Sequence, residues 1–272
     1  MRQLLRKWLA EPTRADTPSV FANRPTLLDH ERLKSEFGAL NRTYVDNQPF
    51  PHIVIDNFLP DDVAQALIDQ YPIDQAKAQW IDGTYREPQG DGYVQKDKRH
   101  LKDILAMPSV YRELIWELNS KGFLDALTQL TGIRALISDP ELLGAGIHQI
   151  ARGGLLKIHA DFANHRKYSL DRRLNFLLYL NPDWKEEWGG HLELWDAEMQ
   201  GPPKRVLPVL NRCVIFTTSA DSYHGHPHPL NCPDGIYRRS IALYYYTNRP
   251  REEELPNGNA TLWQDLPEAY RH

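Results

Sequence analysis

The stretch from Glu141 to Thr247 constrains the fold more than any other part of the chain. Seven apolar segments of strand length follow one another there, separated by Gly, Pro, Asn and Asp. They read GAGIHQIA, LLKIHADF, RLNFLLYLN, GGHLELWD, KRVLPVL, RCVIFTT and RRSIALYYYT. Short strands without intervening helices are typical of an antiparallel barrel or sandwich. The sequence therefore predicts a mainly β fold with flanking helices, whose β core lies at about 141–248.

The residues before this core alternate between helical and extended patterns. Apolar spacing predicts helices over 29–47 and 108–132, and a further helix that begins at Pro60 and ends before Pro72. A strand of β-branched residues at 53–55 lies between prolines. Residues 80–104 are polar and contain several glycines, which predicts a mobile loop that is either solvated surface or a lid over a substrate.

Composition and charge exclude several classes of protein. The net charge of −4, from 32 Lys+Arg against 36 Asp+Glu, lacks the strongly basic balance typical of nucleic-acid binding. No apolar run approaches the ~20 residues of a membrane span. Two cysteines give neither a disulfide framework nor a cysteine metal cluster. Arg6 and Lys7 interrupt the apolar stretch that a secretory signal needs, so we expect a cytoplasmic location and an amphipathic helix over Met1–Ala10. That helix would pack on its own domain or, alternatively, touch an anionic membrane surface.

Histidine and aspartate at alternate positions suggest a metal site. His159 and Asp161 form the only His-x-Asp triplet, and residues two apart on a strand point to the same face. A third ligand is expected from a later strand end, where Ser222-Tyr-His-Gly225 follows VIFTT and supplies His224. Two imidazoles and one carboxylate form the ligand set of non-haem Fe(II) oxygenases, because they leave coordination positions open.

Two other histidine patterns offer alternative ligands. His224, His226 and His228 alternate, as the ligands of a cupin-like metal site would, although the prolines between and after them disfavour a regular strand. His191 and Glu193 also share a strand face. We interpret that pair as part of a packed strand, because its neighbours are Leu and Trp.

Two adjacent arginines begin the last strand of the core. In RRSIALYYYT, Arg238 shares one face with Ser240, and Arg239 shares the other face with Ile241. An arginine that points into the barrel would be a buried, unpaired charge unless it met an anion. Guanidinium pairs with a carboxylate through two parallel hydrogen bonds, so one of these arginines is expected to bind a carboxylate cosubstrate.

Several motifs in a fixed order resemble a known family. They are HAD at 159–161, YLNPDW at 179–184, GGHLELW at 189–195, SYHG at 222–225 and RRSIALYYY at 238–246. Together they resemble the prolyl 4-hydroxylase-like branch of the Fe(II)/2-oxoglutarate-dependent dioxygenases, and PFPHIVIDNFLP at 49–60 is similar to the opening of that catalytic domain. The resemblance implies a double-stranded β-helix (jelly-roll) domain over 49–248. Residues 1–48 would form a helical and connector segment, and 249–272 a tail packing on the core.

The resemblance also implies roles for particular residues. His159, Asp161 and His224 match the iron ligands, Arg238 matches the residue that pairs with the distal carboxylate of 2-oxoglutarate, and Tyr179 matches a tyrosine that hydrogen-bonds to it. The implied cofactors are Fe(II) and 2-oxoglutarate as cosubstrate, with ascorbate as a further candidate.

This chain departs from the family pattern in two places. The interval between His224, the second histidine ligand, and Arg238 is long, which keeps Arg239 as an alternative residue for binding 2-oxoglutarate. The strand before the HxD lacks a tyrosine often found there, and Gln149 is a candidate for its place.

The expected activity is hydroxylation of an unactivated C–H bond by O₂, with release of succinate and CO₂. The substrate would be a peptidyl proline, an amino acid, a saccharide or a small metabolite. The alternatives are a non-catalytic cupin-like module that holds metal or sugar, and a metal-dependent hydrolase with Glu193 as base. Lys157 shares a face with His159 and would either meet an anionic substrate group or lie at the barrel rim. We expect Trp184, Trp188 and Trp195 to serve packing.

Overall fold

The structure, a computed structural model, describes residues 25–72, 80–87, 92–248 and 260–271. The helix expected over Met1–Ala10 lies outside these residues. In the part of the chain that the structure describes, no helix has the length and apolar character to cross a membrane.

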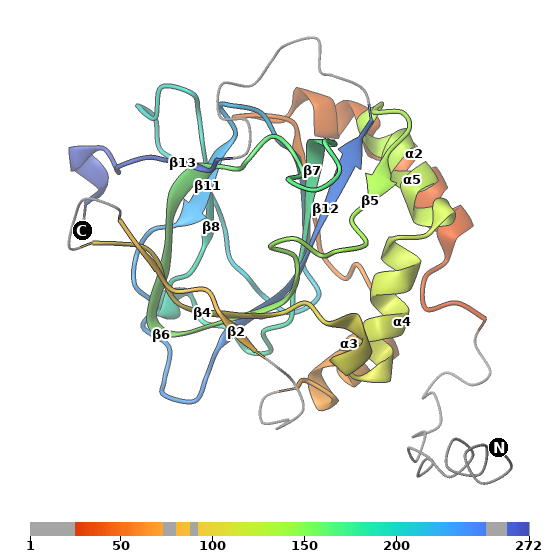
Figure 1. Cartoon of the computed structure of the whole chain (residues 1–272), viewed down its shortest axis with the longest axis horizontal. Helices are drawn as coiled ribbons and strands as arrows, with labels where there is room; N and C mark the ends of the chain where they lie inside the picture. Colours follow the sequence, from red (N-terminus) through yellow and green to blue (C-terminus); the bar gives the residue numbers. More distant parts are fainter. Residues whose placement is uncertain (1–24, 73–79, 88–91, 249–259, 272) are drawn as a thin grey trace, which may run out of the picture.

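The strands form one antiparallel sheet of 13 strands that curls into a nearly closed barrel (Figure 1). Their bounds are β1 His52–Ile55, β2 Ile81–Asp82, β3 Tyr85–Arg86, β4 Tyr93–Leu101, β5 Ile137–Ser138, β6 Gly146–Ala160, β7 Asp171–Tyr179, β8 Leu192–Trp195, β9 Lys204–Val206, β10 Cys213–Thr217, β11 Tyr223–His226, β12 Arg238–Thr247 and β13 Leu262–Trp263. The main path through the sheet runs β1-β10-β7-β12-β6-β11-β8-β9. The predicted mainly β fold is confirmed.

The long strand β6 joins the two halves of the barrel. The sequence predicted two strands here, but the structure has one strand of 15 residues. Its first part pairs with β12 and its second part with β11. Gly153 has a φ of +79°, and a Cβ on Gly154 would lie 2.4 Å from Cγ2 of Ile150. Only glycine fits this bend, which lets both ends of β6 line the same interior.

The segment predicted as a mobile loop over 80–104 is mostly β structure, so that prediction was wrong. Strands β2 and β3 pair with β4, and β4 pairs with β6 from Gln95 to Leu101. Val94 and Leu101 are buried, whereas the strand between them carries four charged residues, including Lys98. The polar composition concealed the strand because one of its faces lines a polar cavity, as described below.

Four helices cover one outer side of the barrel, beside β7 and β12 (Figure 1). Their bounds are α2 His30–Asp46, α3 Asp61–Asp69, α4 Ser109–Leu118 and α5 Lys121–Thr131. The region predicted as helical over 108–132 is two helices, because the chain turns at Asn119 and the Ser120 hydroxyl caps α5.

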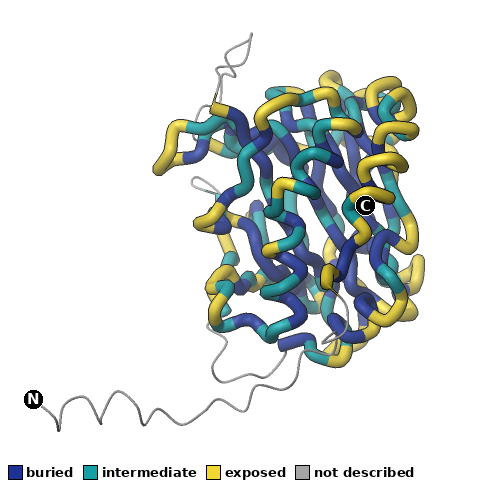
Figure 2. Tube along the Cα trace, turned by 90° about the vertical axis from the view of Figure 1, so that its right-hand side faces the viewer, coloured by how far each residue is buried: buried dark blue, intermediate teal, exposed yellow. Residues whose placement is uncertain are grey.

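The main core lies between these helices and the sheet. The rings of Phe123 in α5 and Phe176 in β7 lie 5.7 Å apart, and Phe37 of α2 packs beside Phe123. Figure 2 shows buried segments through the middle of the molecule and exposed turns around them. Because strand residues alternate, packing Phe176 outward turns Asn175 and Leu177 toward the barrel interior.

Candidate metal and carboxylate site

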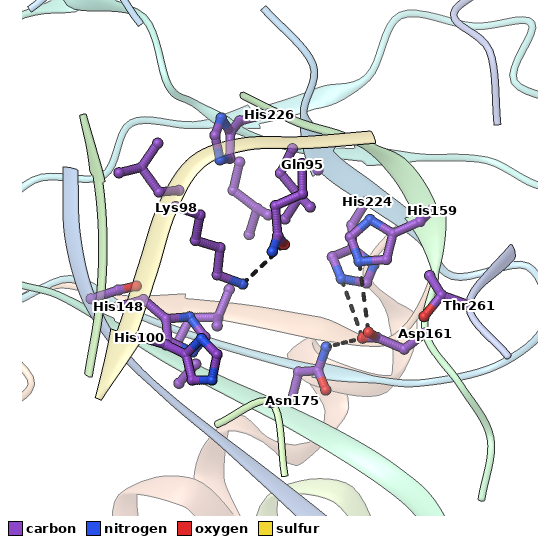
Figure 3. Close-up of a pocket in the computed structure, with 18 of the residues that line it drawn as sticks. Gln95, Lys98, His100, His148, His159, Asp161, Asn175, His224, His226 and Thr261 are labelled. Atoms are coloured by element: carbon purple, nitrogen blue, oxygen red, sulfur yellow. Dashed lines mark hydrogen bonds and ion pairs between the residues drawn. The ribbon is translucent and has the colours of Figure 1, made fainter. Parts of the chain in front are cut away.

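The three predicted metal ligands converge inside the barrel (Figure 3). His159 lies at the end of β6, Asp161 follows it, and His224 pairs directly with His159 across the ladder to β11. The Nε2 atoms of His159 and His224 lie 3.6 and 3.3 Å from the carboxylate oxygens of Asp161. All three ligand atoms lie within 4.8 Å of one another, and all three residues are buried. His224 lies within a short strand, not in the turn after one, and β11 ends before Pro227.

The backbone prepares both imidazoles to bind a metal. Nδ1 of His159 lies 2.9 Å from the carbonyl of Lys157, and Nδ1 of His224 lies 2.9 Å from the carbonyl of Ser222. A carbonyl accepts only, so each Nδ1–H donates and each Nε2 keeps its lone pair toward the common point. Two such nitrogens and one carboxylate oxygen suit a divalent transition metal with open positions, so the residues fit Fe(II).

Asp161 is held by two neighbours that sequence reasoning missed. Nη2 of Arg172 lies 2.9 Å from Oδ2 of Asp161, and Nδ2 of Asn175 donates to the same oxygen at 2.7 Å. Arg172 also donates to Oδ1 of Asn175, and its guanidinium carbon lies 3.4 Å from the centre of the Tyr244 ring. Arg172 is 1 % exposed, so this contact is a buried ion pair.

These contacts keep Asp161 ionised. Burial raises the pKa of its carboxyl group, but the positive charge of Arg172 and contacts with His224 and His159 outweigh that effect, and the net pKa lies well below its usual value. Burial is also the largest cause that lowers the pKa of His159, which favours the neutral imidazole that a metal needs. Both directions favour metal binding.

Arg238 and Tyr179 form a second polar pair in the same cavity. Nη2 of Arg238 lies 3.3 Å from the Tyr179 hydroxyl, and Nε donates to the carbonyl of Gly190 at 2.7 Å. Both side chains are buried. The guanidinium of Arg239 instead lies 4.3 Å from the ring centre of Tyr71, and Arg239 does not line this cavity.

These residues line a cavity of about 240 Å³. Its lining also includes four residues that sequence reasoning did not assign to a site, which are Lys98, His100, His148 and Trp263. Gln149, considered as a replacement for a family tyrosine, does not line this cavity, while its neighbours His148 and Ile150 do. Gln149 lines a different pocket, with Arg99.

The C-terminal segment covers one wall of the metal site. In β13, Trp263 pairs with His159, and the two rings lie 5.0 Å apart at 37°. Beside it, Nζ of Lys157 lies 2.7 Å from Glu87 and 2.5 Å from Asp265. Lys157 therefore joins two segments at the barrel rim and does not line the cavity, which agrees with the second of its two interpretations.

Replacing Trp263 with alanine is expected to weaken metal binding about five-fold. Aromatic pairs in contact contribute about 1 kcal/mol, and this ring restrains the orientation of His159. Calorimetric titration of the metal-free chain with Mn²⁺ measures the change. Trp116→Ala removes an exposed tryptophan of α4 and serves as the control. Equal affinities in the two variants would contradict the role of Trp263.

The other residues considered from the sequence lie elsewhere. Glu193 accepts a hydrogen bond from Nε1 of Trp195 at 3.1 Å and does not line the cavity, so it is not placed as a general base. His191 contacts Glu186 at 2.8 Å, outside the cluster of metal-ligating groups. The rings of Trp184 and Trp188 pack edge to face at 5.3 Å, as expected for packing residues.

Comparisons with known proteins agree with this geometry. Residues 145–246 match the 2OG-Fe(II) oxygenase superfamily. The chain is 23 % identical over 250 residues to Prolyl 3-hydroxylase OGFOD1 of Xenopus laevis, an alignment that covers 86 % of this chain and 44 % of that protein. The chain spans less than half the length of the curated relatives it matches.

Two solved structures show the same fold. A prolyl hydroxylase from Trichoplax adhaerens, solved with a hypoxia inducible factor peptide fragment, matches with a TM-score of 0.55 at 15 % identity, covering 79 % of this chain and 91 % of that one. A prolyl 4-hydroxylase from Phytophthora capsici matches with a TM-score of 0.56 at 21 % identity, covering 85 % and 69 %. These structures share the double-stranded β-helix fold with this chain, and together with the family match over residues 145–246 they support its resemblance to the 2OG-Fe(II) oxygenases of the prolyl 4-hydroxylase-like branch.

Proposed function

We propose that this chain is an Fe(II)- and 2-oxoglutarate-dependent dioxygenase that hydroxylates an unactivated C–H bond. In the reaction, O₂ gives one oxygen atom to succinate and one to the product, and 2-oxoglutarate loses CO₂. The observation that carries the proposal is one cavity that contains both a His-Asp-His ligand set and a buried arginine–tyrosine pair. A module that only held metal would have no use for that second pair.

Each residue of the site has a role in this proposal. His159, Asp161 and His224 hold the iron, which, together with 2-oxoglutarate and O₂, supplies the oxidising chemistry. Arg238 and Tyr179 bind the distal carboxylate of 2-oxoglutarate and fix its orientation. Apolar side chains of the same cavity limit the access of water to the reacting groups. They are Ile150, Leu156, Leu177 and Leu192.

The remaining parts of the proposal concern organisation and setting. We propose a catalytic domain over 49–248, flanked by 1–48 and by a tail over 249–272 that packs on the core. Cys213 and Cys232 are free and buried, which supports a reducing, cytoplasmic setting. The acidic net charge supports the absence of a nucleic-acid partner. The substrate is a small molecule or a peptide, and the name of the Xenopus relative makes proline the first residue to test.

Succinate formation tests the proposal directly. The purified full chain is incubated with Fe(II), 2-oxoglutarate, O₂ and ascorbate, and succinate is measured with each component omitted in turn. We expect succinate only when iron, 2-oxoglutarate and O₂ are all present. If no succinate forms and the Mn²⁺-loaded chain does not bind 2-oxoglutarate in calorimetry, the proposal is wrong.

Arg238→Met is expected to raise the KM for 2-oxoglutarate about 30-fold while changing Mn²⁺ affinity less than about three-fold. Loss of one partner of a buried, hydrogen-bonded charge pair costs about 2 kcal/mol or more, and Arg238 does not touch the metal ligands in any contact of the structure. Arg239→Met, outside the cavity, is the matched control. An unchanged cosubstrate requirement in the Arg238 variant would count against its role.

A further inference from the structure

The cavity carries more positive charge than the metal ligands and the cosubstrate require. Among its described lining residues, Lys98, Arg172 and Arg238 are cationic, and Asp161 is the one carboxylate. Arg172 pairs with Asp161, and Arg238 is assigned above to 2-oxoglutarate. Lys98 therefore faces the cavity without a carboxylate of its own.

The sheet register directs Lys98 into the cavity. Lys98 of β4 and Arg238 of β12 both lie opposite Ile150 of β6, so the three residues form one row across the sheet. Directly opposed residues of antiparallel strands point to the same face. Figure 3 shows Lys98 on the side of the cavity opposite the metal ligands, where its Nζ lies 3.3 Å from Oε1 of Gln95.

Two buried histidines near Lys98 have free hydrogen-bonding atoms. Nε2 of His148 and both ring nitrogens of His226 have no hydrogen-bond partner among the described residues. His148 is 7 % exposed and His226 is 2 % exposed. Burial lowers the pKa of His148 well below its usual value, so this ring is neutral and carries one N–H.

These groups together require an anionic partner. Burial lowers the pKa of Lys98 to about 8, with Arg238 and Arg172 acting in the same direction and Asp161 opposing them, so the amine is still mostly protonated at neutral pH. A partly buried ammonium and buried ring nitrogens without a hydrogen-bond partner are costly unless a polar partner meets them. One lysine with neutral donors matches the single charge of a carboxylate better than the double charge of a phosphate.

We propose that the primary substrate presents a carboxylate to Lys98 while the carbon to be oxidised faces the metal site. This inference rests on the function proposed above and names the substrate class: a compound whose carboxylate lies near its reactive C–H bond. That carboxylate belongs either to a free amino acid or small acid, or to an acidic side chain of a peptide. Lys98 binds the substrate in this account and takes no part in electron or proton transfer.

Pairs of compounds that differ only in charge test the inference. The first arm compares the free L-amino acids, including L-proline, with their carboxamides. The second compares N-acetylated, C-amidated proline peptides that carry Asp or Glu with the same peptides carrying Asn or Gln. Each compound is added to the iron-loaded full chain with 2-oxoglutarate, and the increase in succinate formation is measured. Binding of 2-oxoglutarate to each Mn²⁺-loaded protein is measured separately by calorimetry.

We expect a carboxylate compound to stimulate succinate formation at least ten-fold more than its amide. The arm in which it appears identifies the source of the carboxylate. Lys98→Met is expected to raise the KM for that compound about 30-fold and to leave the Kd for 2-oxoglutarate within two-fold. Lys98→Arg keeps the charge and is expected to retain most of the effect. Lys96→Met, on the same strand but outside the cavity lining, is the control.

Three outcomes would overturn the inference. The first is that acids and their amides stimulate succinate formation equally or not at all. The second is an unchanged KM for the carboxylate compound in Lys98→Met. The third is a weakened affinity for 2-oxoglutarate in that variant, which would assign Lys98 to the cosubstrate. Failure of the proposed function is distinguishable, because the wild-type chain would then neither bind 2-oxoglutarate nor form succinate.

Discussion

Replacing His159 with alanine is expected to abolish metal binding and 2-oxoglutarate turnover together. The variant leaves Asp161 and His224 as ligands, and its two remaining donor atoms no longer surround one face of the ion. Loss of residues that merely orient metal ligands already costs 10- to 100-fold in affinity or activity, so loss of a ligand is expected to cost more than about 100-fold. Metal content after Mn²⁺ loading and gel filtration, and succinate formation with Fe(II), measure the two effects.

His191→Ala is the matched control for that experiment. His191, just before β8, is also a buried histidine near a carboxylate, but its contacts are Glu186 and Arg205, and it does not line the cavity. It should retain metal binding and turnover. If the two variants lose metal equally, the assignment of the site is wrong. If the wild-type chain forms no succinate but binds metal, and His159→Ala loses that metal, the results would instead favour the non-catalytic metal-binding module.

The sequence was sufficient to predict the fold class and to select the residues that converge. Strand alternation places His159 and Asp161 on the same face, and it places the neighbouring Arg238 and Arg239 on opposite faces. The structure brings the selected side chains into one cavity and leaves Arg239 outside it. Local periodicity is enough for such choices, because the face of a side chain depends only on its own strand. The assigned roles of these residues remain predictions.

The residues that sequence reasoning missed depend on contacts between distant segments. Lys98 faces the cavity because β4 pairs with β6, about 50 residues further along the chain. Trp263 reaches His159 through a two-residue strand, which is too short to produce a pattern. Arg172 precedes a second arginine, Arg173, that does not line the cavity, and nothing local distinguishes the two. A polar strand that faces a polar cavity resembles a loop in sequence, which explains the wrong interpretation of 80–104.

Arg172→Met is expected to destabilise the metal-free protein by about 3–5 kcal/mol. Removal of one partner from a buried ion pair leaves an uncompensated charge, here the Asp161 carboxylate. Urea unfolding in the presence of EDTA measures the loss. Arg212→Met breaks the ion pair with Asp56, whose carboxylate side chain is 57 % exposed, and is expected to cost no more than about 1 kcal/mol. Equal losses in the two variants would contradict the structural role of Arg172.

Metal binding should offset part of the loss in Arg172→Met, because a divalent cation supplies the positive charge that the carboxylate has lost. The free energy of unfolding is therefore expected to rise more on Mn²⁺ loading in the variant than in the wild-type chain. Combining Arg172→Met with Asp161→Asn removes the unpaired charge and should recover much of the stability of the metal-free protein, while metal binding is lost. If the double variant is as unstable as Arg172→Met alone, the loss comes from packing around Tyr244 and not from the charge.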